Sequence, residues 1–216
     1  MAKQKKKKGP PHRKGGLMGR SDIPYAQRLQ MDRKMDVATN REHAAKIAMM
    51  YTCCALNESE GIGYKRLVPF SQRMMEYDHE YYSDDPDLKM SHFKRRFEQI
   101  GITVSGELYE VPTGGLVGRE LEVQQNRVHA MQIALYCGVV AMNDEFGIGL
   151  ERQNRVAKKI SEYSKRYKKE GEGFLLEKMR KIGFDVDASG NVRAYMENDG
   201  TVVTPKKWRE SNAKAD

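Results

Sequence analysis

The chain has 216 residues, of which 39% are hydrophobic and 31% charged, so it can bury one sizeable core or two small ones. No apolar run approaches the ~18 residues of a membrane span, and no apolar segment follows the basic N-terminus, so we expect a cytoplasmic protein without a membrane partner. Cys53, Cys54 and Cys137 all lie in apolar runs and lack metal-ligand spacing, which predicts buried thiols and no bound metal or cofactor.

The net charge of +8 is concentrated in the first 20 residues. Removing the eight basic residues of this stretch from the 38 in the chain leaves 30, which equals the number of acidic residues. A segment rich in Lys, Gly and Pro buries too little apolar surface to offset the entropy of ordering, so residues 1–20 are predicted to be a disordered tail. Its candidate phosphate contacts are Lys3, Lys5, Lys6, Lys7, Lys8, Arg13, Lys14 and Arg20.

An internal repeat organises the rest of the chain. NREHAAKIAMM at residues 40–50 and NRVHAMQIALY at residues 126–136 share a pattern at an offset of 86, and further identities continue on both sides. We predict a mostly α fold with small antiparallel β-ribbons, built from two tandem homologous three-helix repeats. The predicted limits are 21–111 for the first repeat, 112–118 for a linker, 119–204 for the second repeat and 205–216 for a frayed C-terminus.

Apolar periodicity predicts the helices of each repeat. In the first repeat we expect helices at about 35–59, extended backwards, then 64–83 and 87–100. In the second repeat the matching central helix is followed by helices at about 150–169 and 173–182. The segments ITVSGELYEV and FDVDASGNVRAYMENDGTVVTP alternate short apolar runs with turn residues, which predicts a ribbon after each third helix.

A GIG tripeptide follows the central helix of each repeat, at residues 61–63 and 147–149. The first glycine suits the left-handed position that ends a helix, and this is the interpretation that we favour. The alternative is a helix-hairpin-helix DNA-binding module, whose backbone N–H groups bind a phosphate. That site would comprise Gly61, Gly63, Gly147 and Gly149 with Lys65, Arg66 and Arg152.

His43 and His129 occupy the same position of the repeated motif. Each precedes a core isoleucine by four residues, so we expect the ring to pack at a helix interface and to bond to a backbone carbonyl. A metal ligand or proton carrier is the alternative, but no second ligand recurs at a suitable spacing. No nucleophile–base set, repeated carboxylate pair or phosphate-binding loop is present, so we predict that the protein is not an enzyme.

Charge differs between the second helices of the two repeats. In the second repeat this helix is predicted to have a cationic outer face, which is a solvated surface, a phosphate contact or a surface for an oppositely charged partner. Its residues are Arg155, Lys158, Lys159, Lys165, Arg166, Lys168 and Lys169. The counterpart in the first repeat carries an acidic stretch, with Glu76, Asp78, Glu80, Asp84, Asp85 and Asp87.

The motif ALNESEGIGYKRL and its mate AMNDEFGIGLERQ resemble small helical proteins of phages and mobile elements of low-GC Gram-positive bacteria. The likeness covers the helix pairs and supplies no catalytic residue. It implies an accessory factor that acts on host or phage nucleic-acid machinery, a class that includes inhibitors of bacterial defence nucleases. Gln153 stands where Leu67 does, so the second copy departs from the pattern.

We therefore expect a non-catalytic accessory protein that binds nucleic acid or a ribonucleoprotein through the tail and the cationic helix face. The alternative is a protein-directed inhibitor of a host defence nuclease, of the anti-CRISPR type, that presents the acidic stretch. A structural phage component is a third possibility.

Overall fold

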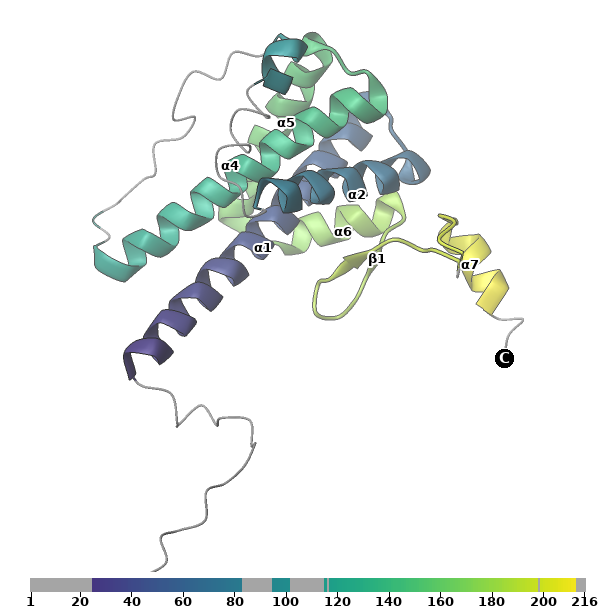
Figure 1. Cartoon of the computed structure of the whole chain (residues 1–216). Coiled ribbons are helices and arrows are strands. Elements are labelled where there is room, and N and C mark those ends of the chain that lie inside the picture. Colours follow the sequence, from purple (N-terminus) through teal and green to yellow (C-terminus); the bar gives the residue numbers. More distant parts are fainter. Residues whose placement is uncertain (1–24, 83–94, 102–114, 116, 198, 213–216) are drawn as a thin grey trace, which may run out of the picture.

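The computed structural model describes residues 25–82, 95–101, 115, 117–197 and 199–212. It is mostly helical, with one small antiparallel sheet, as the sequence predicts (Figure 1). The helices are α1 (Tyr25–Glu60), α2 (Tyr64–Tyr81), α4 (Gly118–Phe146), α5 (Leu150–Glu170), α6 (Gly173–Ile182) and α7 (Pro205–Asn212), and the strands are β1 (Asp185–Val186) and β2 (Val192–Arg193). Residues 95–100, at the end of the helix predicted for 87–100, are also helical.

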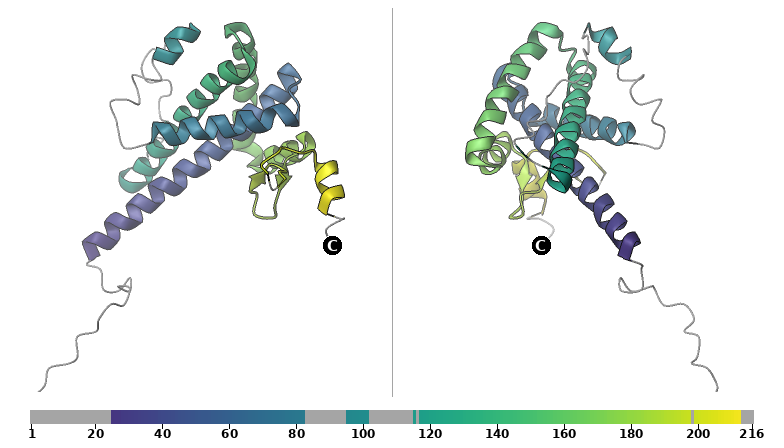
Figure 2. Two further views of the ribbon diagram at one scale, coloured as in Figure 1. Left: turned by 45° about the vertical axis from the view of Figure 1, so that its right-hand side comes forward. Right: turned by 90° about the vertical axis from the view of Figure 1, so that its left-hand side faces the viewer.

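Two long helices, α1 and α4, lie against each other at the centre of the molecule (Figure 2). Small residues line their contact: Ala48, Ala55, Ala134 and Ala141 are fully buried. A Cβ atom added at Gly138 would lie 3.4 Å from Oγ1 of Thr52, so the two backbones approach closely here. Because 52 and 138 are matched at the offset of 86, the helices cross at equivalent positions.

The outer helices pack across this central pair. Helix α2 packs chiefly on α4, whereas α5 and α6 pack on α1. The buried apolar side chains form one cluster that includes Leu56, Phe70, Met142 and Leu175 from four different helices. The core is therefore continuous across the two predicted repeats.

The GIG turns end the central helices as the sequence predicts. Gly61 and Gly147 have φ angles of 65° and 59°, in the left-handed region. Backbone N–H groups of Gly61 and Gly147 donate to the carbonyls of Asn57 and Asn143, at 3.2 and 2.9 Å, which is the hydrogen bond of the left-handed helix-ending motif. Ile62 and Ile148 are buried, so each turn is anchored in the core and directs α2 or α5 back across the bundle.

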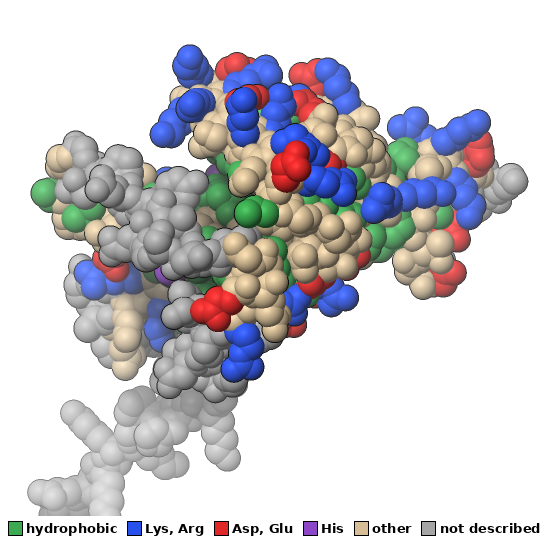
Figure 3. Space-filling model, turned by 90° about the horizontal axis from the view of Figure 1, so that it is seen from above, with side chains coloured by type: hydrophobic (Ala, Val, Ile, Leu, Met, Phe, Trp, Pro, Cys, Tyr) green, Lys and Arg blue, Asp and Glu red, His purple; other side chains and the backbone are tan. Residues whose placement is uncertain are grey.

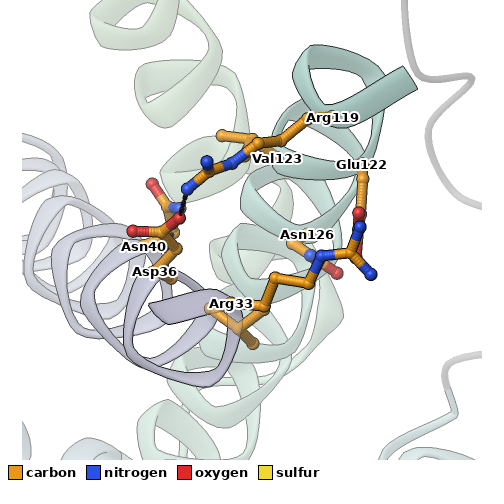
Figure 4. A pocket seen from close by; sticks show the side chains of 8 residues that line it. Arg33, Asp36, Asn40, Arg119, Glu122, Val123 and Asn126 are labelled. Carbon is orange, nitrogen blue, oxygen red and sulfur yellow. Dashed lines mark hydrogen bonds and ion pairs between the residues drawn. The ribbon is translucent and has the colours of Figure 1, made fainter. Parts of the chain in front are cut away.

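The N-terminal parts of α1 and α4 lie side by side without an apolar core. Before Ala44 and Ala130, no described side chain of either helix is buried. Polar bonds join them instead: Arg119 pairs with Asp36, and Nε of Arg127 donates to Oδ1 of Asn40 at 2.6 Å. A crevice between them is lined by Arg33, Asp36, Val37 and Asn40 and by their matches Arg119, Glu122, Val123 and Asn126 (Figure 4).

The C-terminal region forms a ribbon and a helix. Strands β1 and β2 pair antiparallel, and Met196 pairs with Val202 beyond them. The backbone N–H of Tyr195 donates to the hydroxyl of Tyr64 at 2.7 Å, which ties the ribbon to α2. The frayed terminus predicted for 205–216 is wrong over the residues of α7, because Thr204 and Pro205 form a capped helix start that we overlooked. The predicted ribbon at 102–111 lies outside the described residues.

The first testable prediction concerns the two glycines of one turn. Substitution Gly61→Ala should lower the free energy of unfolding by about 1 kcal/mol, because alanine is strained at a positive φ. Gly63→Ala is the matched control, since Gly63 has a φ of −83° and open space around its Cβ position. Urea denaturation of both variants measures the difference, and equal effects would contradict the left-handed conformation assigned to Gly61.

Candidate functional site

Helix α5 is amphipathic in the way that the sequence predicts. Gln153, Val156 and Tyr163 are buried, and Ile160 and Tyr167 are partly buried against the core. The predicted cationic residues lie on the remaining surface, where all except the half-buried Lys159 are exposed. The helix is anchored at its start by the GIG turn, so the cationic surface is held on a rigid element.

Three of the seven predicted cations are engaged in ion pairs within the molecule. Arg155 contacts Glu60 at 3.1 Å, Lys159 contacts Glu162 at 3.0 Å, and Arg166 contacts Glu170 at 2.8 Å. Arg155 and Lys159 also link α5 to the end of α1, through Glu60 and Glu58. These side chains therefore have structural partners and are less available to a phosphate.

The other four cations are Lys158, Lys165, Lys168 and Lys169. All four are exposed, and none forms an ion pair within the described part of the chain. Lys158, Lys165 and Lys169 are spaced by seven and four residues, so they share one side of the helix. Seen from the end of the molecule where α5 lies, Lys and Arg side chains project along the upper edge of the view, with Asp and Glu side chains among them (Figure 3). We call these four residues the α5 lysine face.

The predicted tail contacts, Lys3 to Arg20, lie outside the described residues, as do Asp84, Asp85 and Asp87 of the acidic stretch. The tail and the α5 lysine face are therefore not placed relative to each other by the structure.

The predicted acidic surface is smaller than the sequence indicates. Asp78 is wrong as a surface residue, because its side chain is 7% exposed and lies 3.6 Å from the Arg41 guanidinium. Burial raises the pKa of Asp78, and Arg41 opposes that rise. Glu76 pairs with Arg73 at 2.9 Å, and Glu80 is exposed. The described residues thus do not form a continuous acidic face.

Two acidic residues that the sequence analysis overlooked hold the helices together. Glu58, at the end of α1, binds Lys178 of α6 and Lys159, and it interacts with the side chain of Tyr163. Asp144, the match of Glu58, binds Arg96 and accepts a hydrogen bond from Tyr77, the match of Tyr163. An acidic residue three positions before each GIG tripeptide was the available signal for these two clusters.

Both repeated histidines differ from our expectation. His43 and His129 are exposed, so their rings do not pack in a helix interface. Nε2 of His43 lies 3.5 Å from the hydroxyl of Tyr167. His43 and His129 directly precede Ala44 and Ala130, which are the first buried residues of α1 and α4.

The cysteines are buried thiols, as the sequence predicts. Burial raises the pKa of Cys54 to about 12, so this thiol is not poised to act as a thiolate. Among the described residues, no group of three or more His, Cys, Asp or Glu side chains is arranged to hold a metal ion.

Comparisons of the chain with protein-family models, with curated proteins and with solved structures found no match. The resemblance to phage and mobile-element proteins therefore stays a prediction. None of the helices in the described part of the chain is long and apolar enough to cross a membrane.

The second prediction concerns the pH dependence that Glu58 confers. Burial opposes its ionisation, but interactions with Lys178, Tyr163 and Lys159 outweigh burial and lower its pKa from 4.5 to about 2. The charged form therefore stabilises the fold fully above pH 4.5, and this contribution is lost as the pH falls toward 2.

Substitution Glu58→Gln should lower the free energy of unfolding at neutral pH by about 1 kcal/mol, a value reduced for solvent screening. The difference from the unsubstituted protein should shrink below pH 4.5. Urea denaturation across this pH range provides the measurement. Glu151→Gln is the control, because that carboxylate is 93% exposed, and a pH-independent effect of Glu58→Gln would contradict the assignment.

Proposed function

We propose that this protein is a non-catalytic accessory protein that binds nucleic acid, or a machine carrying nucleic acid, through its basic tail and the α5 lysine face. The observation that carries the proposal is the set of four exposed lysines on one helix that form no ion pair with any described residue. Such cations bind phosphates by releasing condensed counterions, which requires no base recognition.

The spacing of these lysines suits a run of phosphates. Lys158 and Lys169 are eleven residues apart, which is roughly 16 Å along an α-helix. At ~3.4 Å per nucleotide of one strand, this length matches about five nucleotides. The rigid helix presents the cations without a cost of ordering its backbone, so binding depends chiefly on side-chain charge.

The matched positions of α2 differ in charge, which supports placing the contact on α5. Gln72 and His79 stand in α2 where α5 has Lys158 and Lys165. The two helices pack in equivalent ways on the central pair, so packing does not require lysine at these positions. Lys168 and Lys169 also lie in the last turn of α5, where the helix dipole favours cations.

We also propose that the chain contains two homologous repeats whose elements pack across each other. Crossed contacts support this: Arg66 lies over the Phe146 ring at 5.0 Å, while its match Arg152 contacts Glu60, the match of Phe146, at 2.6 Å. The clusters around Glu58 and Asp144 show the same relation, since each acidic residue contacts a tyrosine of the other repeat at matched positions. An origin in a phage or mobile element is part of the same proposal and rests on the motif resemblance alone.

The third prediction tests the α5 lysine face. Neutralising all four lysines to glutamine should weaken retention of duplex DNA or RNA by at least tenfold at low salt, because each lysine that meets a phosphate adds to counterion release. On duplex DNA, the slope of log affinity against log salt should fall in magnitude by up to about 0.9 for each phosphate that is no longer neutralised. Fluorescence anisotropy with a labelled duplex measures both quantities.

The control variant neutralises four lysines that lie on four different helices: Lys34, Lys65, Lys181 and Lys206. It changes the net charge by the same amount as the α5 variant. If the two variants bind alike, the α5 lysine face is not a specific contact.

The fourth prediction tests the tail. Deleting residues 1–20 removes eight cations and should lower affinity at low salt while leaving the thermal unfolding midpoint unchanged. An unchanged affinity after both this deletion and the α5 substitutions would refute the proposed function. Affinity purification with and without nuclease treatment then shows whether the partner is nucleic acid or the protein target of the inhibitor alternative.

A further inference from the structure

A groove of about 980 Å³ lies between α2, α1 and the C-terminal ribbon. Its apolar lining comes from three elements: Met49 of α1, Val68 and Met75 of α2, and Phe184, Val192 and Met196 of the ribbon region. Met75 and Met196 are 43% and 44% exposed, which places them among the most exposed large apolar side chains of the described residues. We call this surface the α2 groove.

The charged residues around the α2 groove already have partners. Lys46 contacts Glu172 at 2.6 Å, Glu76 contacts Arg73 at 2.9 Å, and Arg193 lies 3.8 Å from Asp187. The described lining of the groove therefore offers no unbalanced charge to a phosphate or a metal ion. Flexible thioether side chains adapt to apolar surfaces of varied shape, so the groove suits an apolar occupant.

The matched surface of α5 is polar. Met75 corresponds to Ser161, and both side chains are exposed. Packing of the outer helix on the bundle therefore does not require an apolar residue at this position. Met75 thus gives α2 an exposed apolar side chain that its counterpart lacks.

A second exposed apolar surface lies near the start of α1, away from the C-terminal ribbon (Figure 1). We call residues 25–43 of α1 the α1 arm. Met31 and Met35 of this arm are 56% and 67% exposed and are one turn apart. The other side of the arm faces α4 through Asp36 and Asn40, so the two methionines point away from the bundle.

The volume of the α2 groove is close to that of a short helical segment. An α-helix with a diameter of about 10 Å and a pitch of 5.4 Å occupies roughly 420 Å³ per turn, so the groove accommodates about two turns. Two turns is the length of the arm from Met31 to Ala38. The arm belongs to one straight 36-residue helix that points away from the ribbon, so it does not reach the groove of its own chain (Figures 1 and 2).

We propose that the α2 groove binds the α1 arm of a second copy of this chain, with Met31 and Met35 packed against Met75 and Met196. If the α1 arm of each copy packs in the α2 groove of the other, the two contacts are identical and the assembly is a closed two-fold dimer. This inference is independent of nucleic-acid binding, because the α5 lysine face lies outside both surfaces.

Light scattering coupled to size-exclusion chromatography tests the proposal on nuclease-treated full-length protein. We expect a concentration-dependent species of twice the 24.8 kDa chain mass. Met35→Glu and Met75→Glu should each weaken association by about tenfold or more, since each places a charge in an apolar contact. Val117→Glu is the matched control, because Val117 is 77% exposed and lies in neither surface.

Disulfide cross-linking identifies the surfaces directly. Oxidation of a mixture of Met35→Cys and Met75→Cys proteins should yield a covalent dimer that neither variant forms alone, because the native cysteines are buried. Circular dichroism verifies that each variant is folded. A monomer at all concentrations, a dimer indifferent to both glutamate substitutions, or a cross-link within the Met35→Cys protein alone would overturn the proposal.

Discussion

The close approach of α1 and α4 is the constraint on which the rest of the structure depends. Alanines and one glycine, Gly138, line this contact, so the two backbones come together with little side-chain volume between them. Large side chains are instead supplied from outside, by Phe70 and Met74 of α2 and by Leu175 and Met179 of α6. The outer helices therefore complete the core, and each depends on the turn that directs it across the central pair.

This arrangement separates the parts of the protein that maintain the fold from the parts that are available for binding. The acidic residues before each GIG turn bind cations and tyrosines of neighbouring helices, and these contacts recur at matched positions. Exposed positions that differ between the two copies are not needed for this common packing. The proposed functions accordingly rest on two such differences, the α5 lysine face and the apolar α2 groove.

Charge counted along a sequence overstates the charge that a partner meets. Arg155, Lys159 and Arg166 belong to the cationic pattern of α5, yet each has an acidic neighbour within about 3 Å. Asp78 belongs to the acidic pattern of α2, yet it is buried beside Arg41. A partner is attracted by the unneutralised remainder, because paired charges largely cancel at the distance of an approaching phosphate.

The sequence by itself determined the features that depend on local interactions. Helix limits near 60, 146 and 182 follow from glycines at positive φ, and the inward stripe of α5 follows from the helical period. Tertiary structure alone decided which side chains meet across the bundle: it left His43 exposed, buried Asp78 and paired Glu58 with Lys178 from a distant helix. The reason is physical, since backbone geometry over a few residues sets a helix and its end, whereas burial and ion pairing depend on residues that only the folded chain brings together.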